Sequence, residues 1–192
     1  KRGKMNRTLK LLILSDVFVF GGWGLISPIL AIFINDHLIG GSIQAVGIAS
    51  TIFLITHASL QLLFAKVFNP KDRLWMLILG TALIAIVPFF FIFATDIRHI
   101  YIAQLIHGVG AGFAYPSWSN LFTSNLEKGK RGFQYSVYSS SVGIVTAITA
   151  YFGAVVAEAF SFELVFIITG AIAVIGLLVL FGLQKKEIMK KI

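Results

Sequence analysis

The residues of this sequence that could do chemistry are a few polar side chains inside long apolar stretches. Asp16 is the one acid within such a stretch, and it lies close enough to the cytoplasmic end to face a vestibule there. The histidine side chain changes charge near neutral pH, so His57 suits proton coupling. Polar groups there cost free energy unless they find a partner or face water. The candidates for a solute or proton pathway are Asp16, Trp23, His57, Gln61, Gln104, His107, Trp118 and Ser140.

Each candidate also has a purely structural interpretation. Asp16 could pair with a nearby Lys or cap a helix, and His57 could form a hydrogen bond with Gln61 one helical turn further along. His107 could bond a backbone carbonyl, because polar side chains commonly hold membrane helices together. Aromatic rings such as Trp23 would suit an organic solute but also fill membrane cores. The sequence leaves both interpretations open.

No catalytic constellation accompanies these residues. The sequence contains no HExxH motif or P-loop, and the serines at 139–141 have no convincing Asp and His partners. The four His, at 37, 57, 99 and 107, do not show the spacing of metal ligands. Cysteine is absent, which excludes thiolate chemistry and disulfides. We therefore predict no enzyme activity, no bound metal and no cofactor.

The elements that must position the candidates are long apolar helices. Hydrophobic residues make up 57% of the chain, against roughly 45–50% in soluble domains. A helix needs about 20 residues to cross the hydrocarbon. The sequence predicts an all-α membrane protein, one domain over 1–192, with six transmembrane helices. Their ranges are 9–34, 43–68, 75–95, 99–123, 135–157 and 164–183.

The basic residues predict the orientation of these helices. Fifteen of the 16 Lys and Arg lie before the first helix, in the second and fourth connections, or after the last helix. Arg98 alone falls on the other side, with the acids Asp36, Asp96, Glu158 and Glu163. By the positive-inside rule both termini are cytoplasmic. The net charge of +8 is spread over short loops without a stacking platform, which predicts contact with anionic lipid and not nucleic acid.

Glycines predict where the helices pack closely. Gly21 and Gly24 lie in the first range, shortly before Pro28, and Gly108 and Gly112 form a G-x-x-x-G pair in the fourth. Small residues let two helix backbones approach, and Pro removes a backbone hydrogen bond. We expect the Gly108 face to meet another helix, in particular the first.

The order of these features resembles one six-helix half of a major facilitator superfamily (MFS) transporter over nearly the whole chain. The first range carries a Gly-rich stretch, GLISP at 24–28, and then NDH at 35–37, as in the family. The run QLIHGVGAG at 104–112 fits the family's R-x-x-x-G-x-G-A-G at every Gly, with Gln104 in place of the Arg. The basic loop EKGKRG and the segment AEAFSFELVF are also similar to family features.

Two other family signatures are eroded. In the second connection, Ala65, Asn69 and Asp72 replace Gly, Asp and Gly, whereas Arg73 and Leu77 remain in step. In the fifth range, TA at 149–150 and GA at 153–154 stand in place of the Gly-Pro and Gly-Gly of antiporters. Gating through the missing Asp and antiport of drugs against protons are therefore not carried over.

The resemblance implies a fold and a mechanism. It implies a 3+3 inverted repeat, a small-molecule solute bound near the midplane, and alternating access between two halves. It also implies a second six-helix unit, either an identical copy or a partner half, because polar groups are not tolerated against lipid. We expect the pathway to be lined by the first, second, fourth and fifth helices, with the third and sixth outside as support.

Other functions compete with transport. A membrane-embedded binding or assembly module without transport is favoured by the half size and the eroded signatures. An enzyme acting on lipid would need a nucleophile or metal that the sequence does not offer. A channel would need a ring of carbonyls or charges, which is not visible.

Overall fold

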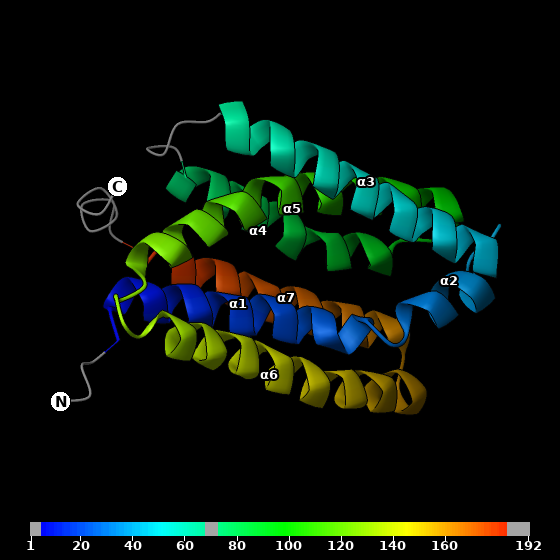
Figure 1. Ribbon diagram of the computed structural model, residues 1–192. Helices are drawn as coiled ribbons and strands as arrows, with labels where there is room; N and C mark the ends of the chain where they lie inside the picture. Colours follow the sequence, from blue (N-terminus) through cyan, green and yellow to red (C-terminus); the bar gives the residue numbers. More distant parts are fainter. Residues whose placement is uncertain (1–4, 68–72, 184–192) are drawn as a thin grey trace.

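The part of the chain that the structure describes folds into seven α-helices (Figure 1). The computed structural model describes residues 5–67 and 73–183. The helices are α1 (Arg7–Ile26), α2 (Leu30–His37), α3 (Ile43–Val67), α4 (Arg73–Ile92), α5 (Ile97–Asn125), α6 (Arg131–Ala159) and α7 (Phe162–Leu180). The all-helical class predicted from the sequence is confirmed. Asn69 and Asp72 of the eroded signature lie outside the described residues.

The first expected helix, over 9–34, is wrong as a single unit, because α1 and α2 divide it. Pro28 has no backbone N–H to donate, and its ring crowds the carbonyl one turn earlier. The chain tightens there, because the Ile29 N–H donates to the Ile26 carbonyl at 3.0 Å. This hydrogen bond spans three residues instead of the four of an α-helix. The helix then resumes at Leu30.

Five segments of the described chain are long and apolar enough to cross a membrane. They are Arg7–His37, Ile43–Phe64, Arg73–Ile92, Arg131–Ala159 and Phe162–Leu180. Helix α5 has the length, with 29 residues, but carries polar side chains such as Gln104 and His107 along it. By length and hydropathy, five candidate spans are found in the described chain, against the six that the sequence predicts. These apolar helices are those of a multi-pass membrane protein.

The helices pack as two groups joined at the centre. Helix α1 packs against α6 and α7, and α5 packs against α3 and α4. Contact between α4 and α7 joins the groups. Helices α1 and α7 run antiparallel and exchange buried hydrogen bonds from Ser15 Oγ to the Gly176 carbonyl, 2.8 Å, and from Thr169 Oγ1 to the Gly22 carbonyl, 3.1 Å.

Glycines lie where the helices approach most closely. A Cβ added to Gly108 would lie 2.7 Å from Thr56 Cβ, and one added to Gly112 would lie 2.8 Å from Leu60 Cβ. Both partners belong to α3, so the expectation that this face meets the first helix is wrong. Gly24 makes the equivalent contact for α1, where an added Cβ would collide with the Thr149 side chain of α6.

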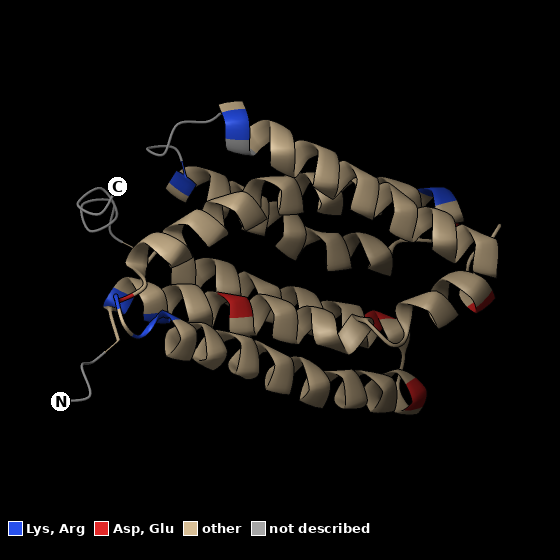
Figure 2. Cartoon of the chain, in the orientation of Figure 1, with Lys and Arg blue, Asp and Glu red and all other residues tan. Residues whose placement is uncertain are grey.

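Charged residues separate to the two ends of the bundle. Figure 2 shows most Lys and Arg of the described chain at the end where α1 begins and α7 ends, and most acids outside the helix centres at the opposite end. At that opposite end Asp96 caps α5, and its carboxylate accepts hydrogen bonds from the backbone and side chain of Arg98. The bond from the Arg98 side chain lowers the pKa of Asp96 to about 2.

We predict that Gly108→Leu and Gly112→Leu each destabilise the protein by about 1–3 kcal/mol or more, because the new side chain must push α3 away from α5. Gly47→Leu is the matched control, since an added Cβ there meets no atom within 4 Å. Thermal unfolding in mild detergent measures the difference. Equal melting temperatures for the three variants would contradict the close contact.

Candidate functional site

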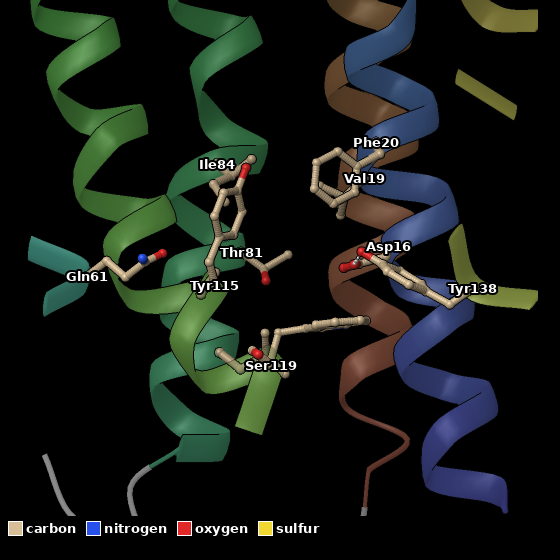
Figure 3. A pocket seen from close by; sticks show the side chains of 12 residues that line it. Asp16, Val19, Phe20, Gln61, Thr81, Ile84, Tyr115, Ser119 and Tyr138 are labelled. Carbon is tan, nitrogen blue, oxygen red and sulfur yellow. Dashed lines mark hydrogen bonds between the residues drawn. The ribbon is translucent and has the colours of Figure 1, made fainter. Parts of the chain in front are cut away.

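A cavity of about 260 Å³ lies between the two helix groups. Figure 3 shows Asp16, Phe20 and Tyr138 on one side of it, with Gln61, Thr81 and Tyr115 across from them. Its complete lining is Asp16, Val19, Phe20, Gln61, Leu77, Thr81, Ile84, Ala114, Tyr115, Trp118, Ser119 and Tyr138. The cavity thus draws residues from α1, α3, α4, α5 and α6.

Asp16 is fixed on one wall by an aromatic partner. It lies nine residues into α1, about 14 Å along the helix axis. Tyr138 of α6 donates its hydroxyl to Asp16 Oδ2 at 3.0 Å. Trp118 packs against the Tyr138 ring with centroids 4.5 Å apart, and its indole N–H reaches the Leu12 carbonyl at 3.4 Å. The carboxylate therefore sits at membrane depth beside two large rings.

The opposite wall holds two of the predicted residues as a pair. His57 Nε2 lies 3.0 Å from Gln61 Oε1, one helical turn along α3. The His57 ring also meets the edge of Tyr115, with centroids 4.7 Å apart. Gln61 and Tyr115 line the cavity, whereas His57 stands behind them. His57 therefore contacts the cavity wall through these two side chains and does not line the cavity itself.

A second cluster joins α1 to α5 away from the cavity. His107 stacks on Trp23 with centroids 4.1 Å apart and meets Phe53 at 4.3 Å. Its Nδ1 lies 3.3 Å from Gln104 Oε1, and both side chains are buried. None of these side chains lines the cavity. Among the residues that the structure describes, Trp23 Nε1 is buried without a hydrogen-bond partner.

The positions of Ser140 and of the third expected helix, α4, differ from those expected from the sequence. Ser140 is exposed on α6 and does not line the cavity. Helix α4, expected outside as support, contributes Leu77, Thr81 and Ile84 to the lining, so that part of the expectation is wrong for this cavity.

Sequence reasoning named Trp118, which lines the cavity, but missed the rings of Phe20 and Tyr138 beside it. Tyr138 follows a basic loop and precedes a serine run, and nothing in that context marks it. The helical spacing of Tyr115, Trp118 and Ser119 was a usable signal, because residues three and four apart share one face. All three line the cavity.

A more polar cavity of about 380 Å³ adjoins the first. Three residues, Gln61, Tyr115 and Ser119, line both cavities. The second extends to Arg73, the first residue of α4, and to Thr123 near the end of α5. Both lie toward the end of the bundle where α1 begins. The two spaces together lead from that end to Asp16.

The site offers groups that could bind a solute. It offers one carboxylate, amide and hydroxyl groups, and aromatic faces. Within the described ranges no three His, Asp or Glu side chains gather as a metal site. A solute could be held here by charge, hydrogen bonds and ring contacts.

Comparisons with known proteins place the chain in a family. The structure is similar to that of the POT family transporter PepTSo, with a TM-score of 0.70 at 15% identity over 93% of this chain, which shows a shared fold. The chain spans 37% of the length of that transporter. No curated protein sequence matches it. The profile of the Major Facilitator Superfamily matches residues 12–191, so the chain belongs to the major facilitator superfamily.

Proposed function

We propose that this chain transports a small solute across a membrane as one six-helix unit of an alternating-access transporter. The observation that carries the proposal is the cavity between the two helix groups, with the Asp16 carboxylate at membrane depth in its wall. Ionisable residues are costly there and mark solute or ion pathways. Membership of a transporter family supports the same function.

The proposed unit has six spans in a 3+3 inverted repeat, with α1 and α2 together as the first span and α5 as the fourth. Gln104 and His107 lower the hydropathy of α5, but both are buried against protein, so the helix can still cross. The packing supports the repeat, because α1 meets α6 and α7 as α5 meets α3 and α4. The Gly24 contact with α6 and the Gly108 contact with α3 are the corresponding pairs.

The proposal includes a second six-helix unit beside α3 and α6. Few side chains of these two helices are buried, in contrast to α1, α4 and α7. Their exposed faces carry hydroxyl groups, such as Ser59 on α3 and Ser139 and Ser140 on α6. Hydroxyls tolerate a protein or water neighbour better than hydrocarbon. The second unit is an identical copy or a partner half.

An alternative function is a membrane-embedded binding or assembly module without transport. The stacked cluster of His107 and Trp23 would suit such a module, because it joins α1 to α5. In a transporter the two repeats of one half can remain fixed while the halves rock against each other. The cluster is compatible with either function.

We predict that the chain lies with both termini in the cytoplasm. The chain has no Cys, so Lys128→Cys and Glu158→Cys place single thiols at opposite ends of α6. In sealed cells, a reagent that cannot cross the membrane should label position 158 and leave 128 unlabelled. Labelling of position 128 from outside would show that the orientation is the reverse of the predicted one.

We predict that the purified chain forms a complex of twice its mass in mild detergent and moves a solute in liposomes. Uptake is measured with a panel of radiolabelled solutes: a sugar, an amino acid, a carboxylate and a quaternary ammonium. Tyr115→Ala should reduce uptake about tenfold or more by removing a cavity wall, whereas Ile175→Ala on the exposed face of α7 should not. A monomer that binds but moves no solute would favour the module.

We predict that water reaches the cavity. Gln61→Cys and Ser119→Cys, both in the cavity wall, should react with a small water-soluble thiol reagent in lipid nanodiscs. Ile175→Cys and Leu178→Cys are exposed on α7 but face hydrocarbon, so they should react at least about tenfold more slowly. Equal rates at all four positions would leave the cavity without a role as a pathway.

A further inference from the structure

We propose that the cavity around Asp16 binds a small organic cation, an ammonium group with apolar substituents. The inference rests on the transport function proposed above and names the class of its solute. Three features of the cavity carry it: an acid without a basic partner, a set of aromatic rings around that acid, and otherwise apolar walls.

The carboxylate of Asp16 lacks a positive partner within the described chain. The ion pairs found there, Arg98 with Asp96 and Lys130 with Glu127, lie at helix ends. Asp16 accepts one hydrogen bond, from Tyr138 to Oδ2, and among the described residues Oδ1 has none. Tyr138 is a neutral donor, so it orients the carboxylate without balancing its charge. A cation in the cavity would supply the missing charge at a depth where an unpaired one is costly.

Aromatic rings surround the position that such a cation would occupy. Four of the lining residues are aromatic: Phe20, Tyr115, Trp118 and Tyr138. The ring centroids of Trp118 and Tyr138 lie 4.5 Å apart. Phe20 and Tyr115 lie on opposite sides of the cavity, with ring centroids 6.2 Å apart (Figure 3). Ring faces attract cations, and several rings together recognise quaternary ammonium groups.

The remaining walls select the rest of the solute. Val19, Leu77, Ile84 and Ala114 are apolar and suit alkyl substituents. The volume of about 260 Å³ is near the lower end of ligand pockets, which favours a small solute. A neutral solute could use the rings but would leave the carboxylate unbalanced, and an anion would be repelled by it. The cavity therefore discriminates by charge.

Choline and its neutral carbon isostere, 3,3-dimethyl-1-butanol, test the charge directly. Binding to the purified chain in phosphatidylglycerol nanodiscs is followed by calorimetry and by tryptophan fluorescence, with Trp118 in the wall as reporter. Choline should bind at least about tenfold more tightly than the isostere. Asp16→Asn should abolish that preference and leave the isostere's affinity unchanged. Asp36→Asn, an exposed acid in α2, is the matched control and should bind like the parent.

Equal affinity for choline and the isostere, or an undiminished preference in folded Asp16→Asn, would overturn the proposal. Thermal unfolding verifies that the variant is folded, and Phe20→Leu provides a second test, since it should weaken choline binding more than isostere binding. Repeating the titration with phosphatidylcholine in the nanodisc separates two sources of the cation. If phosphatidylcholine competes with choline, the site binds a lipid headgroup. If it does not compete, the site binds a soluble cation.

The binding experiment needs no flux, so the two proposals can fail separately. Choline binding that depends on Asp16, without uptake in liposomes, would overturn transport and leave the cation site standing. Uptake of another solute, without any preference for choline over its isostere, would overturn the cation site and leave transport standing.

Discussion

Hydrocarbon offers no hydrogen bonds, so every polar group at membrane depth in this bundle must find its partner inside the protein or face water. The contact between α1 and α7 follows from this constraint, because Ser15 and Thr169 each donate to a backbone carbonyl of the other helix. Those carbonyls belong to Gly176 and Gly22. Helices that lack side chains at these points come close enough for a short hydroxyl to span the gap.

The same close approach sets the shape of the whole bundle. Glycines bring α1 against α6 and α5 against α3, and Gly80 of α4 faces Gly110 of α5. Large side chains fill the space between α4 and α7, in a buried apolar core around Phe91 and Phe166. What is left between the two groups is the cavity. The site is therefore a product of where the glycines allow contact and where bulky rings prevent it.

The chemistry of the site depends on an imbalance of charge within this packing. Basic residues gather at one end and acids at the other, whereas Asp16 stands in the middle of α1 beside the rings of Tyr138 and Trp118. The hydroxyl of Tyr138, a neutral donor, holds the carboxylate in place. In surroundings of low polarity, the attraction between this carboxylate and a cation is stronger than it would be in water. This combination suits selective and reversible binding of a solute.

Sequence alone was enough to predict the helical class, the approximate positions of the apolar helices and Asp16 as a candidate site residue, because hydropathy and a lone acid can be read locally. It did not predict that the chain breaks at Pro28 into two helices, α1 and α2. The packed structure was needed to show that Gly108 contacts α3, that Tyr138 donates a hydrogen bond to Asp16, and that Thr81 of α4 lines the cavity. These contacts join residues on different helices, and helix periodicity fixes only which residues share a face, not which neighbour that face will meet.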